Sequence, residues 1–217
     1  MSRIFLLSPA HCGGKRATQM LSPKATFPLA EQLRSRQGAK LGDVFSFVSG
    51  LYFRGKLTYA RQFAAPDTPG SGVHVITANA GLRDPDTPIT RQALLGFCDA
   101  PVDPGNARYR RPLERSARAL AAEIGPECEV VLLGSVASPK YVAVLTGIFG
   151  DRLRFPIAFV GRGDMSRGGL LLRHAREGVE LEYVPVSGAV LHGARPPKLP
   201  PLRGIAGLQD CRVAEGI

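Results

Sequence analysis

The sequence predicts an α/β protein: a three-layer sandwich whose mostly parallel central sheet has about four to five strands. Two observations lead to this fold class. Short, wholly apolar runs, as at residues 4–7 and 130–133, are typical of strands buried on both faces in a parallel sheet. Between such runs lie segments with the apolar spacing of helices, and alternating strands and helices indicate parallel βαβ units.

The first predicted strand, residues 4–7, leads into a polar turn at residues 8–16. A helix over 27–36 follows, because Pro28 suits a first helical turn and Gly38 is a typical stop. The chain can therefore cross from the first strand to the next one along a helical connection.

An aromatic-rich segment at residues 44–56 precedes apolar residues with helical spacing up to residue 64. Gly50 and Gly55 predict a break around 49–55, since glycine disfavours the interior of a helix. The remaining predicted elements are, in chain order, a strand over 73–78, a helix over 90–97, a helix over 112–124 with Pro112 in its first turn, a strand over 130–133, a helix that Ser138 caps and Gly150 ends, a strand over 154–160, a helix over 167–177 and a strand near 181–186.

Residues 1–193 are expected to form a single α/β domain, since 217 residues suit one hydrophobic core. Residues 194–217 carry four prolines and are expected to form a proline-rich C-terminal tail.

The formal net charge of +10 and a pI near 10.0 are the strongest global signals. Such an excess of positive charge favours phosphate-rich partners, either a nucleic acid or a nucleotide. A merely solvated basic surface remains the alternative. No apolar run reaches the ~18–20 residues that a membrane-spanning helix needs, so no membrane partner is expected.

The four cysteines are widely separated and no pair has the spacing of a zinc site or of a redox motif. The four histidines show no metal-ligand spacing either. No metal and no cofactor are therefore expected. Because the N-terminal apolar stretch is too short for a signal peptide, the protein is expected to be cytoplasmic.

Three glycine-rich segments that carry serine and a cation follow predicted parallel strands, at residues 8–16, 134–140 and 161–169. The carboxyl ends of parallel strands meet at one edge of the sheet, where α/β proteins bind ligands. Glycines let backbone N–H groups approach an anion closely. The residues expected to bind phosphate or nucleic acid are Ser8, Gly13, Gly14, Lys15, Arg16, Tyr52, Arg54, Asn79, Gly134, Ser135, Ser138, Lys140, Arg162, Gly163, Ser166 and Arg167.

Asp164 is the candidate catalytic group, as a general acid or base or as an electrostatic stabiliser. It could instead cap the following helix or pair with Arg162 or Arg167. Tyr52 is the candidate for stacking on a base, because cations flank it in the sequence. The competing role of the neighbouring aromatic residues is core packing.

Two stretches, LYFRGKLTYA at residues 51–60 and VITANAGLRDPD at 75–86, resemble the YaaA peroxide-stress family and its relatives among archaeosine-synthase cores. The opening LLSPA at residues 6–10 is similar to the start of YaaA proteins. This resemblance implies a nucleic-acid-related role on a fold like that of uracil-DNA glycosylases. It carries over no catalytic residue.

These observations favour a protein that binds phosphate and base in a basic cleft and processes the base, with glycosidic-bond or base-exchange chemistry. Glycosylase-like or transglycosylase-like activity is therefore the first hypothesis. A non-catalytic DNA-binding or RNA-binding protein is the second, and a small nucleotide-binding sensor or hydrolase is the third.

Overall fold

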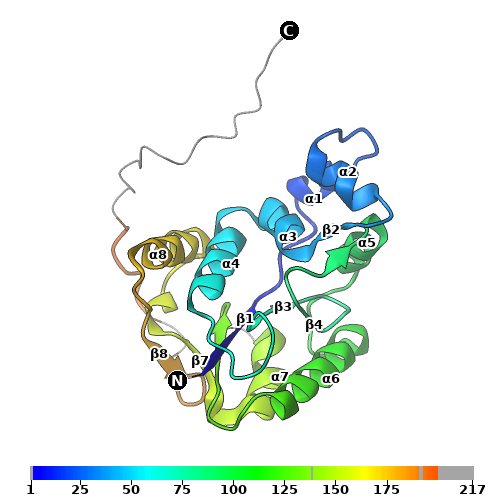
Figure 1. The fold of residues 1–217 in the computed structure, drawn as a ribbon. Coiled ribbons are helices and arrows are strands. Elements are labelled where there is room, and N and C mark those ends of the chain that lie inside the picture. The colour runs from blue at the N-terminus through cyan, green and yellow to red at the C-terminus, as the bar shows by residue number, and fades with distance from the viewer. Residues whose placement is uncertain (1, 138, 191–192, 200–217) are drawn as a thin grey trace.

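The computed structural model describes residues 2–137, 139–190 and 193–199. Its main sheet has six strands in the order β4-β3-β1-β6-β7-β8 (Figure 1). A separate two-stranded antiparallel sheet pairs β2 with β5. The strands are β1 (Arg3–Leu7), β2 (Ala39–Lys40), β3 (Val73–Ile76), β4 (Leu82–Arg83), β5 (Pro88–Ile89), β6 (Glu129–Leu133), β7 (Leu153–Pro156) and β8 (Tyr183–Pro185).

The four inner strands of the main sheet are parallel. β1 lies in the middle and pairs with β3 on one side and with β6 on the other, and β7 extends the sheet beyond β6. The edge strands β4 and β8 are antiparallel to their neighbours. The predicted mostly parallel sheet is confirmed, with six strands instead of the four to five expected. β4 was not expected, because two residues are too few for an apolar pattern.

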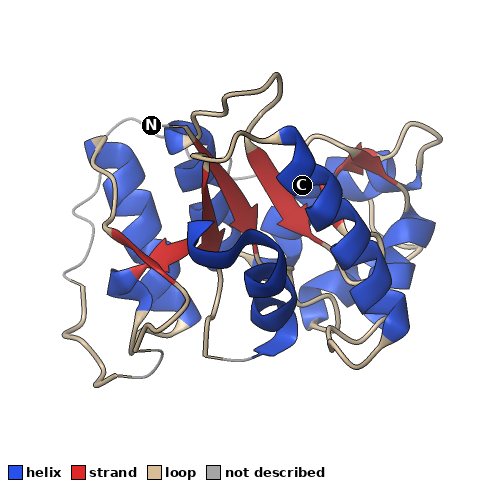
Figure 2. Cartoon of the chain, turned by 90° about the horizontal axis from the view of Figure 1, so that it is seen from below, coloured by secondary structure: helices blue, strands red, loops and turns tan. Residues whose placement is uncertain are grey.

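Helices cover both faces of the sheet and complete three layers (Figure 2). Phe5 and Leu7 of β1 pack into the core that includes α4 and α8, whereas Ile4 and Leu6 pack into the core with α6 and α7. This alternation follows from the strand period of two. The helices are α1 (Lys15–Leu21), α2 (Pro28–Arg34), α3 (Leu41–Ser49), α4 (Leu51–Phe63), α5 (Arg91–Asp99), α6 (Ala107–Glu123), α7 (Pro139–Phe149) and α8 (Asp164–Glu177), with short 3₁₀ helices η1 (Gly150–Arg152) and η2 (Ile157–Phe159).

The predicted start of α6 at Pro112 was wrong. The helix begins at Ala107, because the side chain of Asn106 accepts a hydrogen bond from the Arg108 backbone N–H and caps it. Pro112 therefore lies inside the helix. The helix-start signal of Pro112 was outweighed by the Asn106 cap, which lies six residues before it.

A break in the helical structure was predicted around residues 49–55, and in the structure only Gly50 separates α3 from α4. Gly50, at φ +63°, ends α3 and precedes α4. Gly55 lies inside α4 and does not interrupt it. Gly55 is needed because the backbone of α8 approaches it closely at Gly168.

Three further boundaries differ from the sequence-based expectation. Residues 15–21 form α1, although a polar turn was expected to extend through residue 16. β7 ends at Pro156 and η2 follows, so the expected strand up to residue 160 is shorter. α8 begins at Asp164, three residues before the predicted start.

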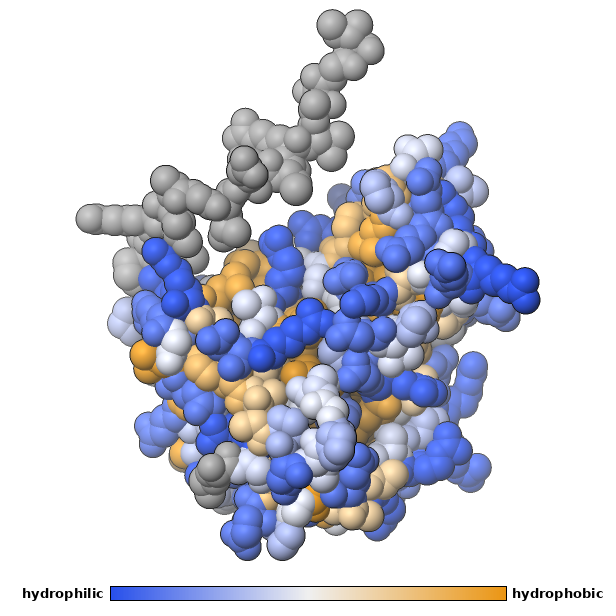
Figure 3. Space-filling model, in the orientation of Figure 1, coloured by the Kyte–Doolittle hydropathy of each residue, from blue (hydrophilic) through white to orange (hydrophobic). Residues whose placement is uncertain are grey.

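Hydrophilic residues cover much of the face seen in Figure 3, with apolar patches between them. Among the described helices, none is both long and apolar enough to cross a membrane. The described beginning of the tail lies against the domain: Leu199 packs partly on the core, and the Ala194 carbonyl approaches Gly161. Residues 200–217 of the expected tail lie outside the described residues.

Candidate functional site

A cavity of about 680 Å³ lies at the carboxyl ends of the parallel strands. It is lined by the connections that follow β1, β3 and β6, together with residues of α4, α5, α7 and α8. β3 and β6, the next parallel strands along the chain, lie on opposite sides of β1, so the strand order reverses there. Open α/β sheets bind ligands at such a point, and the volume suits a small molecule or one nucleotide.

Seven of the residues predicted for phosphate, base or catalysis line this cavity. They come from four separate segments of the chain, and the parallel topology brings them together. These residues are Ser8, Gly13, Tyr52, Ser135, Lys140, Asp164 and Arg167.

The other candidates are absent from the cavity lining, and Ser138 lies outside the described residues. Arg16 and Arg54 line a separate shallow groove together with Phe47. The Asn79 side chain donates a hydrogen bond to the Gly96 carbonyl at 2.9 Å. The remaining candidates away from the lining are Gly14, Lys15, Gly134, Arg162, Gly163 and Ser166.

The segment 161–169 is divided between the cavity and the helix packing. Arg162 donates to the Ala158 carbonyl at 3.0 Å and to Ser166 Oγ at 3.2 Å. These bonds fix the loop before α8. Asp164 and Arg167, one turn apart on α8, are the members of this segment that line the cavity.

Gly168 serves the packing of α8 against α4. A Cβ atom at Gly168 would lie 2.8 Å from the Tyr52 Cα, and one at Gly55 would lie 2.7 Å from the Gly168 carbonyl oxygen. The two glycines therefore let the helix backbones approach closely. This contact gives a structural reason for glycine at a helical position, where it costs about 1 kcal/mol relative to alanine.

Reasoning from the sequence missed Lys56, and also Phe97 and Tyr141 of the cavity lining. Lys56 is 1 % exposed, and its Nζ donates to the Ser8 carbonyl at 2.6 Å and to Ser8 Oγ at 2.8 Å. Nζ also lies 4.6 Å from the ring centroid of Tyr52 and 4.9 Å from that of Phe53. One signal could have found it: Lys56 is four residues from Tyr52 and from Ala60, on the buried face of an amphipathic helix.

Burial lowers the pKa of Lys56 to about 7, and the nearby Asp164 carboxylate opposes this shift. Among the described residues, no carboxylate forms an ion pair with Lys56. A substantial fraction of Lys56 is therefore neutral at pH 7. A neutral amine can accept a proton, which an ammonium cannot.

Tyr141 lies beside Ser8, and the ring of Tyr52 lies beside Lys56. Tyr141 interacts with the side chain of Ser8 and with the Ser135 backbone, and burial raises its pKa. A Cβ atom at Gly134 would lie 2.7 Å from the Tyr141 hydroxyl and 2.8 Å from the Ser8 Cβ. Gly134 therefore leaves the space in which Ser8 and Tyr141 meet.

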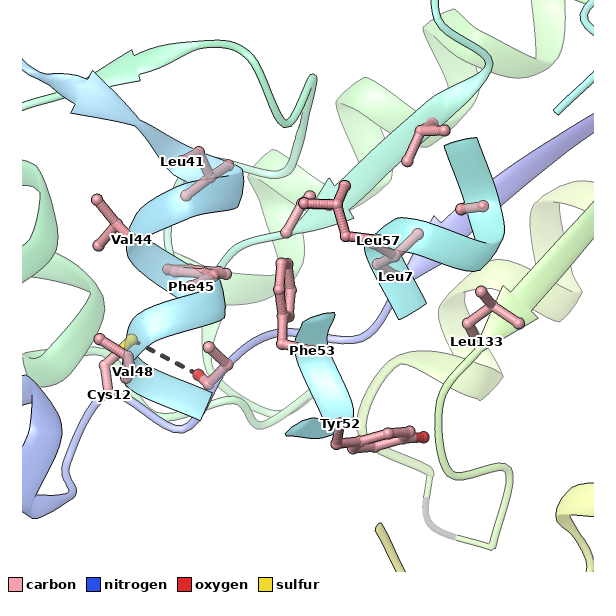
Figure 4. Packing of buried hydrophobic residues seen from close by; sticks show 14 of the residues in the cluster. Leu7, Cys12, Leu41, Val44, Phe45, Val48, Tyr52, Phe53, Leu57 and Leu133 are labelled. Atoms are coloured by element: carbon pink, nitrogen blue, oxygen red, sulfur yellow. Dashed lines mark hydrogen bonds between the residues drawn. The ribbon is translucent and has the colours of Figure 1, made fainter. Parts of the chain in front are cut away.

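Tyr52 is buried, and Figure 4 shows its ring directed away from Phe53. Its hydroxyl is buried and lies near the Arg167 guanidinium. Burial raises the pKa of this hydroxyl, and Arg167 opposes the shift. Lys56 lies over the Tyr52 ring, and Tyr52 lines the cavity while its hydroxyl is buried.

Cys12 also lines the cavity, and its thiol donates to the Ala10 carbonyl at 3.5 Å (Figure 4). Cys98 donates to the Cys12 carbonyl at 3.0 Å. Burial raises the pKa of Cys12 to about 12. The Cys12 thiol is therefore protonated at neutral pH and is not an activated thiolate.

Asp164 has an exposed side chain, and its Oδ1 lies 3.7 Å from Arg167 Nη1. Arg167 itself is held by the Phe159 carbonyl, to which its Nε and Nη2 donate at 3.2 and 3.1 Å. Its guanidinium is thus fixed at the cavity wall before any anion arrives.

Comparison of the chain with protein-family models, with curated proteins and with solved structures gave no match. Within the described part of the chain, no group of three or more His, Cys, Asp and Glu residues is placed to hold a metal ion. The cavity is therefore interpreted from its own geometry.

Proposed function

We propose that the cavity binds a nucleotide unit, either free or as part of a nucleic acid. The proposal rests on the side chains that line the cavity. Lys140 and Arg167 supply positive charge for a phosphate, while Tyr52 and Phe97 supply aromatic surface beside it. The position where the strand order reverses supports the same conclusion, because nucleotides bind there in open α/β sheets.

The net charge of +10 supports an anionic partner. The chemistry that we propose for the bound unit is processing of its base at the glycosidic bond or by base exchange. Asp164 would act as the acid or base, or would stabilise positive charge on the sugar. The resemblance of residues 51–60 and 75–86 to YaaA and archaeosine-synthase cores favours this class over others.

The first experiment measures binding of a nucleoside monophosphate and of a single-stranded oligonucleotide by calorimetry at several salt concentrations. Phosphate contacts predict that log K falls linearly with log salt, with a slope of several units for the polymer. Lys140→Ala should weaken both complexes about tenfold. Lys24→Ala is the control, because Lys24 is exposed and absent from the lining of the cavity.

A salt-independent affinity for the oligonucleotide would contradict the polymer as ligand. Equal losses in Lys140→Ala and Lys24→Ala would contradict the cavity as the site. No measurable binding of either ligand would overturn the proposed function.

The second experiment tests the reaction. Asp164→Asn should lower base release from nucleosides and oligonucleotides by about 10²–10⁴-fold while the affinity stays unchanged. Absence of base release by the unaltered protein, combined with intact binding, would leave a non-catalytic binding protein as the better description.

A further inference from the structure

We propose that Ser8 is an activated nucleophile and Lys56 its general base, for substrates with an electrophilic phosphorus such as a phosphoester. The proposal goes beyond base processing, because it places a second reactive group in the same cavity. The choice of phosphorus rests on the proposed phosphate binding by Lys140 and Arg167. The activation of Ser8 does not rest on it.

The first argument is geometric. Ser8 directly follows β1, lines the cavity and is 7 % exposed. Its Oγ lies 2.8 Å from Lys56 Nζ, which is a hydrogen-bond distance suited to proton transfer. Lys56 is absent from the cavity lining, so it can reach a substrate through Ser8 and not directly.

The second argument concerns the cost of burying Lys56. A fully buried ammonium is unfavourable unless a counter-charge pairs with it. The described residues give Lys56 a carbonyl, a hydroxyl and two aromatic rings, and no ion pair. An apolar residue would fill this place at lower cost if packing were its only role. Such unpaired buried groups are typical of functional sites.

The third argument is the protonation state. Burial lowers the pKa of Lys56 to about 7, with Asp164 of α8 opposing the shift. The other titratable or charged groups that face this cluster are Arg167 of α8, Tyr141 of α7 and Tyr52 of α4. A base with a pKa near the working pH is both available and strong enough to accept a serine proton during attack.

The reaction balances with these groups and water. Ser8 Oγ forms a bond to phosphorus as the bond from phosphorus to the leaving oxygen breaks. The Ser8 proton moves to Lys56 Nζ, which becomes an ammonium, and the leaving oxygen, on the opposite side of phosphorus, takes a proton from water. Lys140 and Arg167 line the same cavity and can stabilise the charge that develops on the phosphoryl oxygens. Water then attacks the phosphorus of the phosphoserine and loses a proton to solvent, while the bond from Ser8 Oγ to phosphorus breaks and Ser8 Oγ takes its proton back from the Lys56 ammonium.

A fluorophosphonate reagent tests this pair without a known substrate. It forms the same bond from serine oxygen to phosphorus and releases fluoride. The full chain should be labelled at Ser8, as located by mass spectrometry of peptides. The labelling rate should rise with pH and level off above an inflection near 7, because neutral Lys56 is the reactive form.

Lys56→Met should reduce the labelling rate at pH 8 at least 100-fold. Ser8→Ala should remove the labelled peptide. Ser49→Ala is the matched control: Ser49 lines the same cavity, and the hydrogen bonds of the described residues give it no lysine partner. The Ser49→Ala variant should be labelled at Ser8 at the same rate as the unaltered chain.

Absence of Ser8 labelling at pH 8, or labelling of Lys56→Met at the unaltered rate, would overturn the proposal. The pH profile of the unaltered protein guards against a misfolded variant: a rate that is flat between pH 6 and 9 would also overturn it. Labelling of Ser8 without nucleotide binding would contradict the proposed function alone. Nucleotide binding without labelling would contradict this inference alone.

Discussion

At the amino-terminal ends of β1 and β6, Arg3 and Glu129 are paired in register and form an ion pair at 2.6 Å. At the carboxyl end of β1, Lys56 lies beside Ser8 without an ion-pair partner among the described residues. Both Arg3 and Lys56 lie at an end of β1 and are shielded from solvent. Among the described residues, carboxylates form ion pairs with Arg3 and none does so with Lys56.

The amino-terminal region is built as a network. Glu129 also pairs with Arg154 at 3.1 Å, and Arg3 also pairs with Glu180. Beside it, the Tyr59 and Tyr183 hydroxyls lie 2.5 Å apart, and Tyr59 accepts a hydrogen bond from the Leu181 backbone. Within the described residues Arg154 Nε is buried without a hydrogen-bond partner, but the carboxylates and the tyrosine hydroxyls named here are paired, as a stabilising buried cluster requires. The comparison shows that this protein surrounds the partly buried Arg3 with carboxylates. The described residues provide no such carboxylate for the fully buried Lys56.

The largest effect is expected from breaking the paired end. Glu129→Gln leaves Arg3 and Arg154 partly buried without this counter-charge, so the free energy of unfolding should fall by about 3 kcal/mol. Urea unfolding of both proteins at pH 7 measures this loss in the free energy of unfolding. Glu180→Gln is the control, since its more exposed carboxylate should cost about 1 kcal/mol or less. Equal losses would show that the two pairs do not differ by burial.

The second prediction concerns the unpaired end. The pKa of Lys56 lies at about 7 in the folded chain, below its ordinary value of 10.5. Between these pH values the unfolded chain binds one more proton, so stability rises with pH. Lys56→Met lacks this titration. The stability of the unaltered protein relative to Lys56→Met should therefore increase by about 2 kcal/mol between about pH 7.5 and 9.

Urea unfolding of both proteins across this pH range checks the sign and the size of that change. Lys24→Met, which replaces an exposed lysine, should run parallel to the unaltered protein. A parallel curve for Lys56→Met as well would mean that Lys56 titrates like an exposed lysine, and the contrast between the two ends would disappear.

A smaller effect should come from Tyr59→Phe at the paired end. This change removes the acceptor of the Leu181 N–H and the partner of the Tyr183 hydroxyl, and a buried unsatisfied group costs about 1–3 kcal/mol. A loss of about 1.5 kcal/mol is expected from thermal or urea unfolding. Tyr59→Phe should leave fluorophosphonate labelling of Ser8 unchanged, and a parallel loss of labelling would show that the two ends are coupled.

Much of the fold was predictable from local patterns. The apolar runs at 4–7 and 130–133 gave β1 and β6 within one residue, because strands buried on both faces must be apolar throughout. The segments after the parallel strands were expected at one end of the sheet, and the topology places them there. Short elements such as β4 and α1 carry too few residues for a periodic signal.

The glycine-rich segment 161–169 shows where the sequence was ambiguous. Its composition fitted an anion-binding loop, yet Gly168 meets Gly55 across two helices that lie more than a hundred residues apart in the chain. A glycine that permits a close approach looks the same in sequence as one that binds an anion. Asp164 and Arg167 of that segment do face the cavity.

The sequence by itself determined the fold class and the basic charge, because hydrophobic period and composition can be read along the chain without knowledge of tertiary contacts. Only the tertiary structure decided which polar side chains share the cavity and which cation is left unpaired. Ser8 and Lys56 are separated by 48 positions in the chain and by 2.8 Å in space. The burial that changes the pKa of Lys56 exists only once α4 has packed onto β1.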